Sequence, residues 1–400
     1  MSDREFDPIS STFFDDPYET YAWMRDEAPV YFNETYGFYA LSRYADVHTA
    51  HKDTDTFSSA YGITIDVLQN RRKLDANMLI MMDPPEHDRM RLLVRQAFTR
   101  KSIDGLEPLV TAAINKFLDE LEGRDSFDIV ADFTAPFPVE VIASMLGFPE
   151  SEDERQQIRH WVDDLLHREA GTAAITPAGI AASGKLWAYV GEQVRAKRKA
   201  PDDGLILSQL IDAVIPGGDG GEDRLTDDDV CGFILLLAGA GSETVTKLIG
   251  NGVVNFEQNP DAWRRVKADP TLIPQSVEEM LRLAPPSQYQ GRFATRDVEL
   301  EGGTIPAGSP TLLVTGAAMR DPRAYPDPDA FDIDRKGPTS VAFGYGTHAC
   351  IGAWLARLEA RVAFEQIAKR WPDYTVDHVG LRRVSMSNVA GYSNVPITVR

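Results

Sequence analysis

Cys350 is one of only two cysteines in the chain, and its surroundings suit a reactive or metal-binding thiolate. It lies in the segment 343–352, FGYGTHACIG, which holds three glycines. Glycines adopt backbone conformations that are closed to residues with a Cβ, and they let the backbone approach another group closely. An amphipathic run follows at 354–361, and a helix there would point its N-terminal N–H groups at the sulfur and favour the thiolate. The thiol is therefore a candidate metal ligand or nucleophile.

An acid and an alcohol stand side by side at Glu243 and Thr244, inside a long apolar segment. Apolar residues on all sides of this segment predict a buried helix. Gly239 and Gly241 weaken such a helix by about 1 kcal/mol each relative to alanine, so a kink or a closely approaching ligand is expected there. Because unpaired polar groups are costly to bury, the acid and the alcohol mark a candidate reaction centre.

Two further polar pairs have the spacing of neighbours on one helix face. His87 and Arg91 stand at i and i+4, and Glu279 and Arg282 at i and i+3. Taken alone, each pair is most simply a solvent-exposed pair that contributes about 0.2–0.5 kcal/mol. Cys350 taken alone is compatible with an inert core thiol, with a metal ligand, and with the nucleophile of a cysteine hydrolase. These alternatives stay open at the level of the single motifs.

Most of the chain shows the apolar spacing of helices. We predict helices at residues 17–25, 103–121, 133–146, 153–168 and 180–199, and a longer one that starts with the signature Thr226-x-x-Asp229 and ends at Pro260. Short strands are predicted at 37–41, 297–300 and 310–314. The glycine-rich stretch 216–221 is predicted to be a surface turn before the long helix. The fold class is thus mainly α with a minor β portion, in a single domain that covers residues 1–400.

The chain has 400 residues, with 41 basic and 61 acidic side chains and a formal charge of −20. This balance argues against nucleic-acid and anionic-membrane partners. The two cysteines, Cys231 and Cys350, are too few and too far apart for a disulfide framework or a four-cysteine zinc site. The N-terminal residues lack the layout of a signal peptide, and the longest apolar run, 233–238, is far shorter than the ~20 residues of a membrane span. We expect a cytoplasmic protein without a membrane span.

In this order, the motifs resemble those of the cytochromes P450, in particular the soluble bacterial ones. Residues 343–352 resemble the haem-ligand loop of that family, and residues 240–244, AGSET, resemble its oxygen-activation segment. The Glu-x-x-Arg motif at 279–282 matches its structural ion pair, residues 325–332 match the stretch before the ligand loop, and residues 83–91 match its early propionate-binding helix. The resemblance covers nearly the whole chain. It implies the P450 fold, with haem b buried between the long central helix and the Cys-ligand loop.

The resemblance also implies roles for individual residues. Cys350 is expected to be the thiolate ligand of the haem iron, which favours O–O cleavage. Glu243 and Thr244 are expected to be catalytic and to route protons to O2. The other expected cofactor-binding residues are His87, Arg91, Arg292 and His348 at the propionates, Phe343 and Gly344 beside the sulfur, and Ala240 and Gly241 on the central helix. Glu279 and Arg282 are expected to form a buried structural network with an arginine near 321–323, and Cys231 is expected to be structural.

The implied function is a monooxygenase that hydroxylates or epoxidises a hydrophobic small molecule, such as a lipid, terpenoid, steroid or secondary metabolite. A haem-thiolate peroxygenase, an oxidative coupling catalyst and a ligand-binding or sensing haemoprotein are the alternatives, and the Glu243–Thr244 pair favours O2 over peroxide. By resemblance, the pocket should draw on residues 60–77, 170–187, 236–244 and 286–290, and a mobile lid is expected at 168–174. The polar sequence SQYQ at 287–290 predicts a substrate with a hydrogen-bonding group.

Electrons are expected from a second protein, because no flavin or iron–sulfur segment is recognisable in the chain. The family uses a ferredoxin and its NADPH- or NADH-dependent reductase. Residues 89–101 hold five basic side chains and no acidic one: Arg89, Arg91, Arg95, Arg100 and Lys101. This helix should lie on the proximal side of the haem, where complementary charge would steer an acidic ferredoxin. We expect a monomer.

Overall fold

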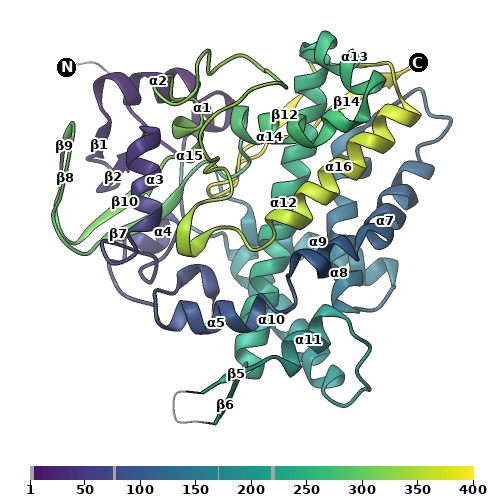
Figure 1. Cartoon of the computed structure of the whole chain (residues 1–400), viewed down its shortest axis with the longest axis horizontal. Coiled ribbons are helices and arrows are strands. Elements are labelled where there is room, and N and C mark those ends of the chain that lie inside the picture. Colours follow the sequence, from purple (N-terminus) through teal and green to yellow (C-terminus); the bar gives the residue numbers. More distant parts are fainter. Residues whose placement is uncertain (1–3, 75–77, 170, 218–220) are drawn as a thin grey trace.

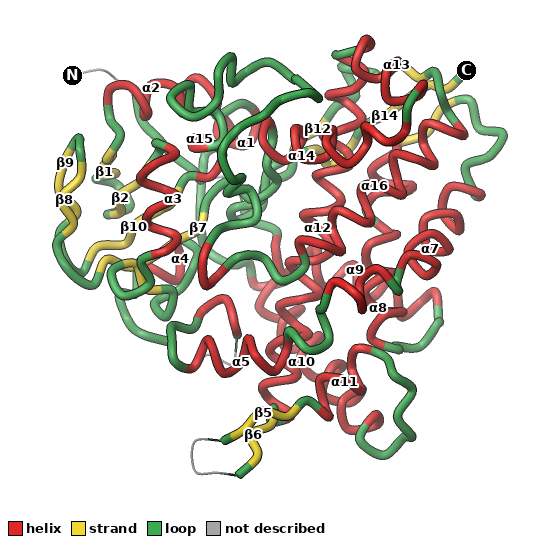
Figure 2. The backbone as a smooth tube through the Cα atoms, viewed as in Figure 1, coloured by secondary structure: helices red, strands yellow, loops and turns green. Residues whose placement is uncertain are grey.

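The computed structural model describes residues 4–74, 78–169, 171–217 and 221–400. It confirms a mainly helical fold with a smaller β portion (Figures 1 and 2). Parts of three predicted features lie outside the described residues: the centre of the turn at 218–220, residues 75–77 of the pocket, and residue 170 of the lid.

The long central helix α12 (Asp227–Gln258) runs unbroken through the body of the molecule (Figure 1). Its predicted start is confirmed, because Thr226 and Asp229 form a reciprocal capping box. By length and composition α12 could cross a membrane, but 78% of its most apolar window is buried inside the protein. Burial on all faces is what a core helix requires.

The glycines inside α12 do not interrupt the helix, although the sequence predicts a kink or a close ligand there. At Gly241 the reason for a small residue is packing, since a Cβ would lie 2.8 Å from Cδ1 of Ile142 in α8 (Pro136–Leu146). A Cβ at Gly239 would meet no heavy atom within 4 Å. Packing therefore explains the first of these glycines and leaves the second beside open space.

Helices from both halves of the chain pack on α12. They are α8, α9 (Glu152–Leu166), α10 (Pro177–Lys197), α14 (Ile273–Leu283) and α16 (Ala353–Arg370). The other helices are α1 (Ser11–Asp15), α2 (Tyr18–Glu27), α3 (Tyr44–Lys52), α4 (Ile65–Leu68), α5 (Glu86–Val94), α11 (Ile206–Asp212), α13 (Pro260–Ala268) and α15 (Thr315–Ala318). The predicted helices at 17–25, 153–168 and 180–199 are thus confirmed as α2, α9 and α10, with ends shifted by a few residues.

Two predicted helices differ from the structure at their N-terminal ends. The one expected at 103–121 is divided into α6 (Arg100–Asp104) and α7 (Glu107–Asp119). Pro108 lies in the first turn of α7, where its missing N–H is tolerated, and the ring would break a helix that continued through it. The helix expected at 133–146 begins as a π-helical turn (Val130–Thr134), and α8 then starts at a proline.

The main sheet has five strands in the order β1 (Val30–Asn33), β2 (Phe38–Leu41), β10 (Ser309–Leu313), β7 (Gln290–Ala294) and β3 (Phe57–Ser58). β10 pairs parallel to β2 and antiparallel to β7. A second sheet contains β4 (Ser126–Asp128), β11 (Tyr374–Val376) and β14 (Pro396–Val399). Two-stranded sheets are formed by β5 (Val214–Pro216) with β6 (Glu222–Arg224), by β8 (Val298–Leu300) with β9 (Gly303–Ile305), and by β12 (Arg382–Arg383) with β13 (Tyr392–Asn394). The three predicted strands are confirmed as β2, β8 and β10.

The molecule contains two large hydrophobic cores. The larger core gathers the apolar faces of α7, α8, α12, α14 and α16, and the smaller one lies between the main sheet and the N-terminal helices. Figure 1 shows the sheet on the left, the large helices on the right, and the yellow-green loop before α16 between them in this view. The candidate functional residues come from the loop before α16 and from the elements around it.

Candidate functional site

The loop before α16 folds tightly around its glycines. Gly344 and Gly346 have positive φ angles of 67° and 68°, a backbone conformation that favours glycine. A Cβ at Gly346 would also lie 2.8 Å from the backbone oxygen of His51, so a side chain has no room there. The N–H of Cys350 donates to the oxygen of Phe343 at 2.8 Å and closes the loop. As predicted, the loop needs glycine at these positions, because its backbone has positive φ angles there and because α3 approaches it closely.

Cys350 is solvent-accessible, although the protein atoms around its thiol desolvate it. Burial raises the pKa of the Cys350 thiol, and the N–H groups of Gly352 and Ala353 and the charges of Arg91 and Arg357 oppose this. The predicted effect of the helix start is thus present in the N–H groups of Gly352 and Ala353, and burial of the thiol acts against it.

The four residues predicted to bind propionates lie together on three elements. His87 and Arg91 come from α5, Arg292 from β7 and His348 from the 3₁₀ turn Gly346–His348. The rings of His87 and His348 are 4.3 Å apart between centroids. Arg91 donates from Nη2 to the backbone oxygen of Ala349 at 2.6 Å, next to Cys350. The structure therefore brings the predicted set to the ligand loop.

This cationic cluster has buried polar atoms without partners. Nε2 of His87 and Nε2 of His348 are buried and make no hydrogen bond. Arg292 is only 3% exposed and donates to the oxygen of its neighbour Gly291. Burial lowers the pKa of Arg292 to about 10, against a weaker attraction from Asp83, and burial together with the charge of Arg292 lowers the pKa of His348 to about 2. A ligand with two carboxylates would satisfy these groups, as the propionates of haem b would.

His51 is a member of the cluster that the sequence analysis missed. It is 2% exposed, both of its ring nitrogens are buried without a partner, and burial and the charge of Arg292 lower its pKa to about 3. It stands at i+4 from Val47 and next to Ala50 on the buried face of α3. A histidine inside an apolar helix face was the signal that could have found it.

One stripe of α12 is open in a helix that is otherwise buried. Leu236 and Thr244 are half-buried and Ala240 is exposed, at the spacing of four that keeps residues on one helix face. The hydroxyl of Thr244 donates to the oxygen of Ala240 at 2.7 Å. The stripe therefore presents a small, mainly apolar surface with a hydroxyl to an open space beside the middle of α12.

Glu243 faces away from that stripe into the protein. It is 4% exposed, and its Oε2 lies 2.9 Å from Nζ of Lys247, one turn later on α12. Lys247 is itself buried. The predicted acid–alcohol pair is therefore present as a buried, ion-paired carboxylate next to an accessible hydroxyl.

The Glu-x-x-Arg motif forms a complete buried network, as predicted. Arg282 donates to both oxygens of Glu279 at 2.7 and 2.8 Å, and to the backbone oxygens of 319, 328 and 330. The third member of the network is Arg335, whose Nε lies 3.0 Å from Glu279. The expectation of an arginine near 321–323 is wrong, because Arg323 pairs instead with Asp26 and Asp321.

The polar sequence at 287–290 is engaged within the protein. Gln288 donates to the oxygen of Pro285 and accepts a hydrogen bond from Tyr21, and Gln290 donates to Ser287 and accepts one from Thr315. Both amide groups therefore have protein partners. Their positions therefore do not support the prediction that the substrate carries a hydrogen-bonding group.

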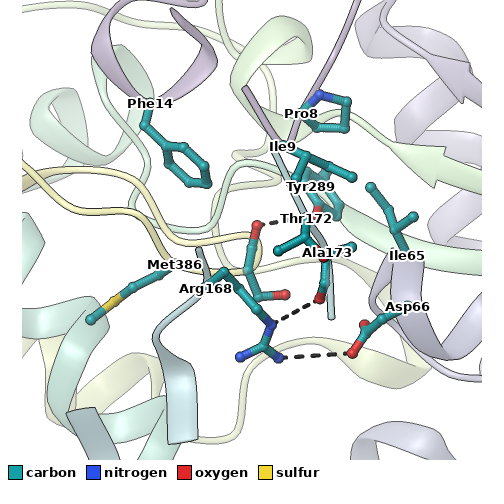
Figure 3. Close-up of a pocket in the computed structure, with 11 residues that line it drawn as sticks. Pro8, Ile9, Phe14, Ile65, Asp66, Arg168, Thr172, Ala173, Tyr289 and Met386 are labelled. Carbon is teal, nitrogen blue, oxygen red and sulfur yellow. Dashed lines mark hydrogen bonds and ion pairs between the residues drawn. The ribbon is translucent and has the colours of Figure 1, made fainter. Parts of the chain in front are cut away.

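A small pocket lies where the predicted lid meets the N-terminal segment, α4 and residues 385–387 (Figure 3). Arg168 points at the oxygen of Ala173, 3.0 Å from Nε, and at Asp66, 3.9 Å from Nη2. The N–H of Gly171 donates to the oxygen of Ile9, and that of Arg168 to Ser385. The described part of the predicted lid is thus tied to three other segments.

The basic surface near the ligand loop is smaller than the sequence predicts. Arg89 forms a two-point ion pair with Asp223, and Arg91 turns inward to the loop. Arg95, Arg100 and Lys101 are exposed. Arg100 lies beside α16, where Trp354 is 49% exposed and has the Arg100 guanidinium 5.0 Å from the centre of its ring. Arg357 lies over the rings of both Trp354 and Phe343, and it is paired with Glu278.

Comparisons with known proteins agree with this geometry. A model of the family "Cytochrome P450" matches residues 179–372. A putative cytochrome P450 123 of Mycobacterium tuberculosis is 40% identical over 396 residues, which cover 98% of this chain and 96% of the relative. A vitamin D(3) 25-hydroxylase of Pseudonocardia autotrophica is 36% identical over 406 residues, 99% of this chain and 97% of the relative. Among solved structures, CYP109Q5 from Chondromyces apiculatus has a TM-score of 0.87 at 31% identity, with 99% of this chain and 98% of that one covered. CYP109E1 from Bacillus megaterium, in complex with corticosterone, has a TM-score of 0.83 at 32% identity, with 96% and 98% covered.

Proposed function

The chain belongs to the cytochrome P450 family of haem-binding monooxygenases, and from this premise we propose that it oxidises a hydrophobic small molecule with electrons from an acidic ferredoxin. The observation that carries the proposal is the buried cluster beside Cys350, whose arginines and unpartnered histidine nitrogens suit a ligand with anionic groups. We further propose that residues 1–400 act as one cytoplasmic, monomeric catalytic domain.

Cys350 would hold the haem iron through its sulfur, and the cation would offset the cost of burying the thiolate. Arg292, His87, His348 and Arg91 would hold the propionates; Phe343, Gly344, Ala240 and Gly241 would line the two sides of the cofactor. Arginine suits this role because its planar fork can bond both oxygens of a carboxylate. When bound, haem supplies the activation of O2 and the insertion of one oxygen atom into substrate.

The chain's own residues would handle protons and exclude water. The hydroxyl of Thr244, at the open stripe of α12, would hold a proton at the reaction space, and Glu243 behind it would resupply that proton. The side chains of Leu236 and Ala240 would keep the same face apolar. This division, with one hydroxyl on an apolar surface, suits a hydrophobic substrate positioned beside O2.

Steroids and secosteroids are the first substrates to test. One relative is named as a vitamin D(3) 25-hydroxylase, and a structural neighbour has been solved with corticosterone and with testosterone. The apolar stripe of α12 supports the same class for this chain. A glycoside or peptide substrate is less suited to that surface, since each buried polar group would need its own partner.

The electron donor would dock at a surface made of Trp354, of Arg100 beside it, and of the exposed Arg95 and Lys101. The chain is strongly acidic overall, so a local basic surface four residues from Cys350 would orient an acidic partner toward the ligand loop. Exposed tryptophan is enriched among the residues that dominate binding energy at protein interfaces. Trp354, held between two guanidinium groups, would be the anchor of this surface.

The test of the function combines spectroscopy with turnover. The reduced, CO-bound holoprotein should show the haem-thiolate absorbance, and Cys350→Ser should lose it, whereas the control Cys231→Ser should keep it. Vitamin D3, testosterone and corticosterone are then offered with a plant-type ferredoxin, its reductase, NADPH and O2. A product that gains one oxygen atom from ¹⁸O2 supports the proposal. A thiolate spectrum without oxidation of any probe, but with product formed from added peroxide alone, would replace it by a peroxygenase.

The docking surface is tested by reversing charge. Arg95→Glu with Arg100→Glu should slow reduction by ferredoxin at low salt by about tenfold or more, and less so at high salt. The control changes the same charge on α10 and just after it, with Lys185→Glu and Lys199→Glu, both at exposed positions. Equal rates for the two double variants at low salt would remove the docking proposal.

A further inference from the structure

Helix α5 carries polar side chains on two opposite faces. His87 and Arg91 face the ligand loop, where Arg91 donates to the oxygen of Ala349. Arg89 is two residues from each of them, and two residues correspond to about 200° around a helix. It therefore lies on the other side of α5, toward the hairpin β5–β6, which contacts α5 at the lower edge of Figure 1. α5 thus lies between the ligand loop and this hairpin.

Arg89 makes a two-point ion pair with Asp223 on β6. Its Nε and Nη2 donate to Oδ2 and Oδ1 of Asp223 at 2.5 and 2.6 Å. Nη2 also donates to the backbone oxygen of Arg224 at 3.0 Å, and Nη1 lies 4.0 Å from Oδ2 of Asp229. The side chains of Arg89 and Asp223 are 37% and 29% exposed, so solvent screens the pair only in part. A planar guanidinium bonded to both oxygens of a carboxylate fixes direction as well as distance.

The hairpin is a firm support for α5 because it leads almost directly into α12. On β6, Asp223 pairs with Ile215 of β5 in the hairpin ladder. A single residue separates β6 from Thr226, the N-cap of α12. A second contact lies just beyond the end of α5, where Nε2 of Gln96 donates to the oxygen of Val214 at 3.1 Å. The hairpin therefore joins α5 to the start of the central helix at two places.

The inner face of α5 needs such a support because its polar groups are incompletely satisfied. Nε2 of His87 is buried without a partner. Burial also lowers the pKa of the Arg91 guanidinium, because the charge is partly removed from water. Both groups would gain contacts with water if α5 shifted or turned away from the ligand loop. The ion pair on the outer face opposes such a movement, because it would disrupt the alignment of Arg89 with both oxygens of Asp223.

Apolar contacts keep α5 in its place in the fold but fix its rotation less strictly. Met90, Leu93 and Val94 are buried in the larger hydrophobic core. Burial of apolar surface is favourable but has no preferred direction, whereas the two-point ion pair has one. Removing the ion pair should therefore leave the helix formed and loosen only its exact position.

We propose that Arg89 and Asp223 form a positioning clamp, which holds α5 at the place and rotation where His87 and Arg91 meet the propionates of haem. Both are positioning residues, because they act through His87 and Arg91. Polar groups that are already in place bind a ligand more tightly, since less ordering is required when it binds. The proposal rests on the haem site of the function proposed above.

The first test compares Asp223→Ala with Glu222→Ala. Glu222 is the matched control, because it lies next to Asp223 on β6 and pairs with Arg224 at an exposed position. Amide hydrogen exchange of residues 86–94 in the holoprotein should become about three- to tenfold faster in Asp223→Ala and should not change in Glu222→Ala. Arg89→Gln, which leaves the hairpin sequence intact, should have the same effect as Asp223→Ala, and the double variant should add nothing further. Exchange at the wild-type rate in both single variants would overturn the clamp.

The second test asks whether the clamp acts through the propionate contacts. Asp223→Ala should lose haem to apomyoglobin about three- to tenfold faster than the wild type, and Asp223→Glu should restore most of the retention. With haem whose propionates are methyl esters, the wild type and Asp223→Ala should lose the cofactor at equal rates, because His87 and Arg91 then have no carboxylate to bind. An equally large difference with the ester would overturn the positioning role, since it would reflect a general loss of stability. Absence of the haem-thiolate absorbance in the wild type would instead count against the proposed function, and hydrogen exchange of the full chain without cofactor would still decide whether the clamp holds α5.

Discussion

Two buried groups of charged side chains differ in whether the protein itself supplies their polar partners. Around Glu279, two arginines and several backbone groups use both carboxylate oxygens and the donors of Arg282. Around Arg292, histidine ring nitrogens are buried without partners, and Asp83 is the carboxylate whose charge acts on the arginine. The first group is balanced by the protein itself. The second is balanced only when a ligand brings negative charge.

This difference separates residues that serve the fold from residues that serve a cofactor. A buried ion pair with every donor used stabilises one arrangement of the chain, whether or not a ligand is bound. A buried cluster of unpartnered donors raises the free energy of the empty protein and lowers that of the complex. The two clusters should therefore respond differently to mutation and to removal of haem.

The largest effect is expected from Glu279→Gln. This variant leaves Arg282 and Arg335 buried without a counter-charge, so the free energy of unfolding should fall by about 3–5 kcal/mol. The loss should be similar in the haem-free and haem-bound protein, measured by urea unfolding of each. A fall of less than about 1 kcal/mol, or one confined to the haem-bound form, would contradict the comparison.

Arg292→Leu, in contrast, should weaken the binding of haem without destabilising the haem-free protein. Losing a hydrogen bond to a charged group costs about 1.5–3 kcal/mol, so haem affinity should fall by about tenfold to a hundredfold. The haem-free protein should be as stable as the wild type or more stable, because a buried unpaired charge is removed. Haem transfer to apomyoglobin and thermal unfolding measure the two effects.

The matched control is Arg296→Leu, four residues along the chain. Arg296 is exposed and bonds Thr56 and Asp53, outside the cluster. Arg296→Leu should change neither haem affinity nor the stability of the haem-free protein appreciably. Equal losses of haem affinity in the two leucine variants would show that Arg292 has no special role at the propionates.

The smallest effect at neutral pH is that of His51, which instead carries a pH dependence. Its pKa is about 3 in the folded protein, below the ~6.5 of a free histidine, because it is buried. The unfolded chain therefore binds one more proton between these values, so stability is full above pH ~6.5 and falls as the pH drops toward ~3, by up to about 1.4 kcal/mol per pH unit. His51→Phe should flatten this slope in the haem-free protein, and His378→Gln, at a half-exposed histidine paired with Glu257, should not. An unchanged slope in His51→Phe would mean that His51 is not held neutral.

The sequence predicts the parts of the site whose residues lie close together in the chain. The Cys350 loop, the pair at 243–244 and the motif at 279–282 are local patterns, and the structure places their members as neighbours. Arg335 meets the motif at 279–282 only through folding, and nothing in its own segment marks it. The directions of Gln288 and Gln290 also depend on partners such as Tyr21, far away in sequence. Tertiary contacts of this kind are what one sequence leaves undetermined.

The apolarity of α12 also has a consequence during synthesis of the protein. Before its neighbours fold around it, this segment is long and apolar enough to be mistaken for a membrane anchor. Lys247 in its second half would oppose insertion into a bilayer by about 2.5–3.5 kcal/mol, and Glu243 would add to that cost. The same charged pair that sits behind the reaction space would thus help to keep the nascent helix in water, and its removal should direct more of the newly made chain to membranes or aggregates.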